Sequence, residues 1–262
     1  MANRVITCAL LLFFALQPQA LDFNDYHLID LSHAYDENTL YWPTSPTKFE
    51  KTELSHGNSP DGYFYSAYSV CTPEHGGTHL DAPMHFAENG VSTEKVPLES
   101  LMANAVVIDV SASAARDRDY LLSVEDVLAF EKEHGQIKKG NIVLLRTGWS
   151  GFWPDAKLYL GDNTPGDASN LHFPAYGADA ARLLVEDRKV TILGVDTASA
   201  DYGQSKDFLV HRITAEHGVS NLENLTNLHK LPATGAMVIA LPMKISGGSG
   251  GPARVVALVP RD

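Results

Sequence analysis

The stretch Gly140-Asn141-Ile142-Val143-Leu144-Leu145-Arg146 decides the fold class, because it places a continuous apolar run directly after a turn signal. Such runs are typical of strands that are buried on both faces of a sheet. Outward from it, apolar or β-branched segments predict further strands at 27–31, 105–110, 190–195, 237–241 and 255–259. Helical patterns lie between them at 123–133, 176–186 and 222–228. We therefore predict an α/β fold with a mixed sheet flanked by helices.

The chain of 262 residues is expected to form one domain over residues 21–262. It contains no internal repeat, low-complexity tract or charge block, and its Gly and Pro residues are spread as turn residues rather than gathered in a linker. Its 44% hydrophobic and 20% charged residues match the composition of soluble globular proteins. The chain is therefore long and apolar enough to bury a sizeable core.

The N-terminus has the pattern of a secretory signal peptide over residues 1–20. Arg4 precedes an apolar run from Val5 to Leu16, and Ala20 is the expected cleavage point. A run of about 12 residues is too short to span a bilayer as a helix. We expect export to a periplasm, a secretory lumen or the medium without a stable membrane anchor; a buried N-terminal helix is the alternative.

Cysteine content and net charge limit which cross-links and which classes of partner fit this chain. Cleavage would remove Cys8 and leave Cys71, which we expect to be a small buried residue without a disulfide partner. The formal net charge of −12 argues against nucleic acid or an anionic membrane as a partner. A small-molecule substrate is favoured.

A dense polar segment runs from Glu74 to Phe86 and contains three histidines and one aspartate within eleven positions: His75, His79, Asp81 and His85. Imidazole and carboxylate groups are ligands that borderline divalent metals prefer. The cluster predicts a metal site at His75, His79 and Asp81. Taken singly, each histidine is more often an ordinary loop residue.

Convergence of these ligands requires the backbone to bend. A fully extended chain would separate the Cα atoms of His75 and His79 by about 13 Å, too far for both to reach one ion. Gly76 and Gly77 can adopt backbone angles that are closed to other residues, so they can fold the chain back. Beyond them, residues 78–81 alternate as in a strand, which places His79 and Asp81 on one face.

His85 is the candidate general base. It follows Asp81 by four residues, and imidazole has an unperturbed pKa of about 6.5. It can therefore take a proton from water and return it to a leaving nitrogen. A purely structural histidine is the alternative.

Two further groups of residues are candidates for the site. The polar segment 211–217 and the nearby residue 223 offer His211 and Glu223 as additional ligands, although spacing alone does not separate them from Glu216 or His217. Trp42 and Phe64 are candidate walls of a pocket for a flat aromatic substrate. Aromatic residues of this kind are more often part of a core.

The pattern His-Gly-Gly-Thr-His-Leu-Asp-Ala-Pro-Met-His at 75–85 resembles the signature of the cyclase-like metal-dependent hydrolases, which include bacterial kynurenine formamidase and isatin hydrolase. Further landmarks of this family occur in order at 30–33, 146–149, 194–197, 223–225 and 251–254. The similarity therefore extends over most of the chain.

The resemblance implies a swivelling-type β/α domain that forms homodimers or homotetramers. It implies a metal at His75, His79 and Asp81, with His211 and Glu223 completing a second position in the formamidase type, and His85 as the base. The cofactor would be Zn²⁺ or Mn²⁺, with one or two ions per chain.

Three functions follow as expectations. The leading one is an arylformamidase acting on N-formylkynurenine or a related aryl formamide. The alternative is opening of a lactam or lactone ring, as in isatin hydrolase. The non-enzyme alternative is a catalytically inactive metal-binding protein, which the presence of His85 disfavours because a closed structural site needs no base. A serine hydrolase is disfavoured because no Gly-x-Ser-x-Gly elbow occurs where a strand meets a helix.

Overall fold

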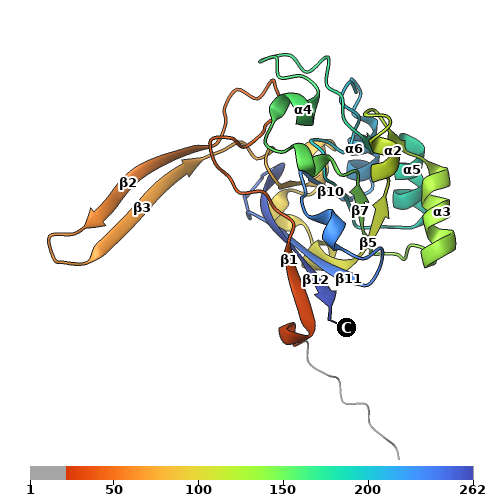
Figure 1. Cartoon of the computed structure of the whole chain (residues 1–262), viewed down its shortest axis with the longest axis horizontal. Helices are drawn as coiled ribbons and strands as arrows, with labels where there is room; N and C mark the ends of the chain where they lie inside the picture. The colour runs from red at the N-terminus through yellow and green to blue at the C-terminus, as the bar shows by residue number, and fades with distance from the viewer. Residues whose placement is uncertain (1–21, 262) are drawn as a thin grey trace, which may run out of the picture.

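A computed structural model describes residues 22–261, and an eight-stranded mixed sheet forms its centre (Figure 1). The strand order is β1-β12-β11-β5-β7-β9-β10-β4. Because β4 also pairs with β12, the sheet closes on itself and leaves β1 as an added edge strand. The strands are β1 (Tyr26–Asp30), β4 (His79–Asp81), β5 (Met102–Asp109), β7 (Ile142–Arg146), β9 (Ile192–Val195), β10 (Ser220–Glu223), β11 (Ala236–Pro242) and β12 (Gly250–Pro260).

The apolar run of β7 lies in the middle of this sheet and is buried on both faces. Val143 and Leu145 pack in one hydrophobic cluster with residues of the helices, whereas Ile142 and Leu144 pack in a second cluster with residues of β11 and β12. Strands β5, β7, β9 and β10 run parallel to their neighbours in that series, and the other pairings are antiparallel. The predicted α/β class with a mixed sheet and flanking helices is confirmed.

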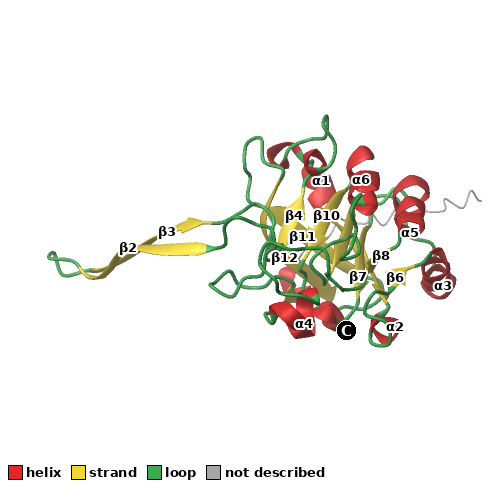
Figure 2. Ribbon diagram, turned by 90° about the horizontal axis from the view of Figure 1, so that it is seen from above, coloured by secondary structure: helices red, strands yellow, loops and turns green. Residues whose placement is uncertain are grey.

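Three helices cover one face of the sheet (Figure 2): α3 (Val124–His134), α5 (Ala178–Arg182) and α6 (Leu209–Glu216). Helix α3 begins at the predicted cap, where Ser123 and Asp126 bond to each other's backbone N–H groups. A single π turn, Leu183–Asp187, extends α5. The short helices are α1 (Leu98–Leu101), α2 (Ser111–Ala114) and α4 (Ala156–Leu160), with 3-10 turns at Phe23–Asp25, Pro83–His85, Thr93–Lys95, Trp149–Phe152 and Leu228–Lys230.

A long hairpin projects away from the rest of the molecule (Figures 1 and 2). Its strands, β2 (Glu50–Asn58) and β3 (Phe64–Cys71), pair only with each other. Cys71 ends β3 and is exposed, so the expectation of a buried thiol is wrong. A second small pair joins β6 (Leu121–Leu122) to β8 (Ala175–Tyr176).

The structure corrects one predicted element. Residues 222–228 do not form a helix, because Leu222 belongs to β10 and is paired on one side with Leu80 and on the other with Gly194. Burial between two strands overrides the short helical pattern. Helix α6 and the hairpin strands were not predicted.

The predicted signal peptide, residues 1–20, lies outside the described residues. Within the described part of the chain, the helices are too short or too polar to cross a bilayer.

Candidate metal centre

A bend at Gly76 and Gly77 folds the chain back before β4. Gly76 has a φ of +140° and Gly77 a φ of +56°, which are conformations that side chains disfavour. A Cβ atom at Gly76 would also collide with the ring of Tyr41, and one at Gly77 with the ring of Tyr35. The predicted glycine bend is confirmed, and both its backbone angles and its close packing require glycine.

Strand β4 places two of the predicted ligands on one face. His79 and Asp81 alternate with the fully buried Leu80, as expected for an extended chain. The antiparallel neighbour β10 pairs Glu223 directly with His79. The carboxylate of Glu223 therefore lies next to His79, although the two residues are far apart in the sequence. Helix α6 supplies His211.

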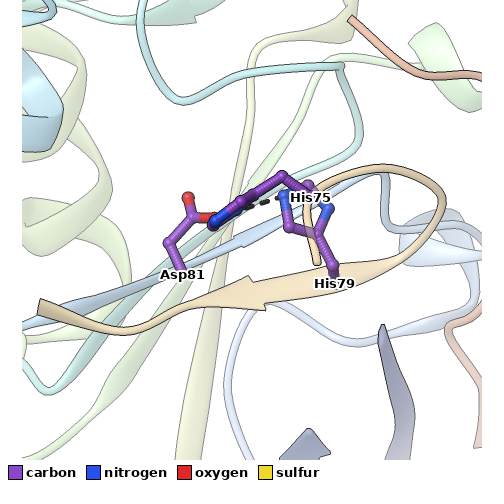
Figure 3. A group of neighbouring side chains, drawn as sticks. All are labelled: His75, His79 and Asp81. Carbon is purple, nitrogen blue, oxygen red and sulfur yellow. Dashed lines mark hydrogen bonds and ion pairs between the residues drawn. The ribbon is translucent and has the colours of Figure 1, made fainter. Parts of the chain in front are cut away.

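The structure brings His75, His79 and Asp81 together (Figure 3). The Nδ1 atom of His75 lies 2.7 Å from Asp81 Oδ1, and the Nε2 atom of His79 lies 3.2 Å from the same oxygen. Their ligand atoms all lie within 4.8 Å of one another. One cation could therefore contact all three side chains.

A second group forms around the other carboxylate oxygen of Asp81. His211 Nε2 lies 3.2 Å from Asp81 Oδ2 and 3.1 Å from Glu223 Oε1. Asp81 is thus shared between two adjacent groups of candidate ligands, one on each of its oxygens.

Burial and charge at this cluster fit a divalent cation. Asp81 and Glu223 are only 2% and 5% exposed, and no Lys or Arg side chain lines the described pocket around them. Buried carboxylates are costly unless a positive charge accompanies them. The imidazole and carboxylate donors are those that zinc and manganese accept.

The pKa values of the cluster respond to this crowding. Burial alone would lower the pKa of His79, but Asp81 and Glu223 outweigh it and raise that pKa to about 9. Burial alone would raise the pKa of Asp81, but His79, His211 and His75 hold it well below its usual value. The carboxylates of Asp81 and Glu223 therefore stabilise a positive charge placed next to them.

The nitrogens of His79 and His211 that face away from the cluster have hydrogen-bond acceptors. His79 Nδ1 donates to the carbonyl oxygen of Gly77 at 3.0 Å. His211 Nδ1 lies 2.6 Å from Asp201 Oδ2, and Asp201 also accepts the backbone N–H groups of Val210 and His211. Because an acceptor holds the hydrogen on Nδ1, Nε2 is the nitrogen that each ring turns towards the cluster.

His85 lies beside the ligands without belonging to either group. Its ring stacks on that of His75 with centroids 3.8 Å apart, and its centroid lies 5.9 Å from that of His211. Burial lowers the pKa of His85 to about 4, which Asp81 only partly offsets. The imidazole is therefore neutral near pH 7 and able to accept a proton.

An apolar cavity of about 270 Å³ opens over the cluster. Trp42 lines it, as predicted from the sequence. Phe64 does not: it lies on β3 of the projecting hairpin and is 61% exposed, so its assignment to the pocket of its own chain is corrected. The other apolar walls are Leu40, Tyr41, Phe86, Leu160, Ala198 and Phe208.

The structure separates the alternatives that spacing left open. Glu216 and His217 are exposed at the end of α6, whereas His211 and Glu223 are buried at the cluster. Sequence analysis missed Asp201, which precedes His211 by ten residues in a loop and follows no spacing rule. Phe86 could have been found, since it is adjacent to His85.

Comparisons with known proteins agree with this geometry. The family described as "putative cyclase" matches residues 29–202, which is more than half of the chain. An isatin hydrolase of Roseibium aggregatum is 35% identical over 222 residues, covering 82% of each chain. A kynurenine formamidase of Salinibacter ruber is 31% identical over 234 residues, covering 87% of this chain and 96% of the relative.

Among solved structures, isatin hydrolase A from Labrenzia aggregata, bound to benzyl benzoate, superposes with a TM-score of 0.83. It is 33% identical, and the match covers 91% of this chain and 95% of that chain. The fold and the site together define a metal-dependent hydrolase, of the class that acts on carbon–nitrogen bonds other than peptide bonds. The chain belongs to the putative cyclase family.

Proposed function

We propose that this enzyme hydrolyses a small, uncharged aryl amide, and in particular opens a lactam ring fused to an aromatic ring. The observation that supports this proposal most directly is the pocket. Its apolar walls include Leu40, Trp42, Phe86 and Phe208, and none of the described residues that line it is a Lys or an Arg. A cavity of about 270 Å³ lies near the lower end of the ~300–1,000 Å³ range of ligand pockets, so a compact ring system suits it.

The proposed metal ligands are His75, His79 and Asp81 at one position, and Asp81, His211 and Glu223 at an adjacent one. We propose Zn²⁺ or Mn²⁺ as the ion, with up to two per chain. A divalent cation held there supplies Lewis-acid chemistry, because it polarises a carbonyl group and makes an attacking water more acidic.

The protein's own residues complete the reaction. The aromatic walls hold the ring of the substrate with its carbonyl towards the cluster. A ring nitrogen of the neutral His85 takes a proton from the attacking water as the new carbon–oxygen bond forms. The same nitrogen then gives the proton to the departing nitrogen as the carbon–nitrogen bond breaks.

Arylformamidase activity is the second candidate, and the kinship with kynurenine formamidase over nearly its whole length favours it. N-formylkynurenine, however, carries an ammonium and a carboxylate on its amino-acid group. Among the described residues, the pocket lining contains no Lys or Arg that would pair with that carboxylate. An uncharged aryl formamide fits this pocket better than the amino acid does.

The experiment combines elemental analysis with direct assays. Protein purified without added metal is analysed for zinc and manganese, and its hydrolysis of isatin and N-formylkynurenine is measured. We expect one or two bound ions per chain and a higher kcat/KM for isatin. A higher kcat/KM for N-formylkynurenine would transfer the assignment to the second candidate, and activity that survives complete metal removal would refute both.

We also propose that the enzyme is exported, on the basis of the apolar segment between Arg4 and Ala20. Expression of the full chain should yield a mature protein that begins near residue 21 outside the cytoplasm. N-terminal sequencing of that fraction tests the proposal, and an intact Met1 would contradict it.

A further inference from the structure

Ser249 connects two residues that are adjacent in sequence, Glu74 and His75. Its Oγ atom lies 2.8 Å from Nε2 of His75 and 2.7 Å from Oε2 of Glu74. Its backbone N–H also donates to Oε2 of Glu74 at 2.9 Å. One continuous chain of hydrogen bonds thus joins Glu74, Ser249 and His75 behind the proposed metal ligands. We call it the Glu74–Ser249–His75 relay.

The positions of the hydrogens in this chain follow from simple counting. A serine hydroxyl has one hydrogen, and a carboxylate can only accept, so the Ser249 hydrogen points to Glu74. The Ser249 oxygen must then accept from His75, which requires a hydrogen on Nε2. The other nitrogen, Nδ1, lies 2.7 Å from Asp81 Oδ1, so it donates to that carboxylate when no ion is bound, and it is the nitrogen that a metal ion at this position would contact.

We propose that Glu74 and Ser249 are positioning residues that hold His75 in the tautomer with its hydrogen on Nε2, so that Nδ1 is the atom offered to the metal. His75 then differs from His79 and His211, whose Nδ1 atoms carry the hydrogen and whose Nε2 atoms face the cluster. The relay is needed because His75 enters from a loop before β4, whereas His79 lies within the strand.

The surrounding backbone keeps Ser249 in register with the site. The carbonyl oxygen of Ser249 accepts the N–H group of Ala82 at 2.8 Å, and the next residue, Gly250, is paired with Asp81. A Cβ atom at Gly250 would lie 2.6 Å from Cε1 of His75. Glycine at 250 therefore leaves room for the ring that Ser249 orients.

The same atoms invite comparison with a Ser-His-Asp triad, since Ser249, His75 and Asp81 are bonded in that order. Residues 247–251 even match Gly-x-Ser-x-Gly. Ser249, however, leads into strand β12 rather than a helix, does not line the cavity, and has its hydroxyl hydrogen committed to Glu74. Its position fits orientation of His75 rather than attack on a substrate.

The inference rests on the proposed function, because it assigns a ligand atom of the proposed metal site. Partners of this kind fix the ring and raise the basicity of a metal ligand, and their loss costs about 10- to 100-fold in metal affinity or activity. We therefore expect the relay to control zinc affinity.

Zinc affinity is measured on the full chain by competition with a chromophoric chelator. Ser249→Ala and Glu74→Gln should each weaken zinc binding by about 10- to 100-fold, and Ser249→Thr, which keeps the hydroxyl, should restore it. Glu94→Gln is the matched control, because Glu94 also anchors this loop, through the N–H group of Gly247, but does not contact His75. Equal losses in Glu94→Gln and Glu74→Gln would overturn the proposal by showing that only loop anchoring matters.

The tautomer is read in the zinc-loaded protein. ¹⁵N-histidine NMR of that protein should show the His75 hydrogen on Nε2, with the resonance assigned through a His75→Gln variant. Ser249→Ala should move part of it to Nδ1. A His75 hydrogen on Nδ1 in the zinc-loaded unaltered protein would overturn the proposal, whereas an unaltered protein that binds no zinc would refute the proposed function instead.

Discussion

His85 is the residue whose replacement separates metal binding from turnover. Its ring stacks on that of the proposed ligand His75 but belongs to neither group of candidate ligands, and its pKa of about 4 leaves it neutral at pH 7. His85→Ala should retain the metal content of the unaltered protein and lower kcat by about 10²- to 10⁴-fold, the usual contribution of a general base. Elemental analysis and steady-state kinetics check this. Unchanged kcat would contradict the role assigned to His85.

His33 is a half-buried histidine outside the ligand groups, and it links stability to pH. Its ring stacks on Trp153 at a centroid distance of 4.2 Å, its Nε2 is buried with no hydrogen-bond partner among the described residues, and burial lowers its pKa to about 4. Between pH 6.5 and 4 the unfolded chain binds a proton there that the folded chain does not, so the free energy of unfolding should fall as the pH falls.

The variant His33→Phe keeps an aromatic ring against Trp153 but removes this titration. Relative to the unaltered protein, it should lose about 1 kcal/mol less stability between pH 7 and pH 5, after allowance for the partial exposure of His33. Urea unfolding at both pH values measures the difference. His229→Phe, at an exposed position, should leave the pH dependence of stability unchanged. If it reduces that dependence as much as His33→Phe does, burial of His33 is not the cause of the effect.

At the scale of elements, strands β4 and β10 bring together two adjacent groups of candidate metal ligands rather than one. The antiparallel pairing sets Glu223 opposite His79, and Asp81 contributes one oxygen to each group. If both positions are filled, Glu223→Gln should reduce the metal content by one ion per chain, whereas Asp81→Asn should remove both.

Elemental analysis after gel filtration measures the metal content. Glu216→Gln, on the exposed end of α6, is the control and should retain the full content. Equal losses in Glu223→Gln and Asp81→Asn would contradict a shared Asp81 between two positions.

At the scale of the whole molecule, the projecting hairpin predicts self-association. Leu54, Phe64, Tyr65 and Val70 are each more than half exposed on it, and a two-stranded hairpin is marginal in water by itself. The expected homodimer or homotetramer would cover these side chains.

Phe64→Glu combined with Val70→Glu should therefore shift the protein to monomers. Light scattering coupled to gel filtration measures the molar mass. Leu128→Glu, at an exposed site on α3, should leave the mass unchanged. A monomer in the unaltered protein would contradict the predicted assembly.

Several features of the fold and site could be predicted because they are local. The apolar run 142–146 is sufficient to predict a central strand, whichever strands pair with it. The bend before β4 follows from the conformational freedom of Gly76 and Gly77. Ser123 and Asp126 lie three residues apart, which is sufficient to predict the start of α3.

Other features required contacts between distant parts of the chain. The segment 222–228 has a helical pattern, yet Leu222 is held in a strand by β4 and β9. Phe64 has the same aromatic character as Trp42, but only Trp42 is near the cavity. No local pattern distinguishes these outcomes.

The sequence by itself determined the α/β class, the glycine bend and a cluster of ligands within residues 75–85, because neighbouring residues impose those features on one another. Only the tertiary structure decided which distant side chains join them. Glu223 arrives by strand pairing, His211 by a helix whose Asp201 partner lies in a loop, and Ser249 by closure of the sheet onto β12. These placements depend on how the strands are ordered in space, and that order is set by burial of the whole core.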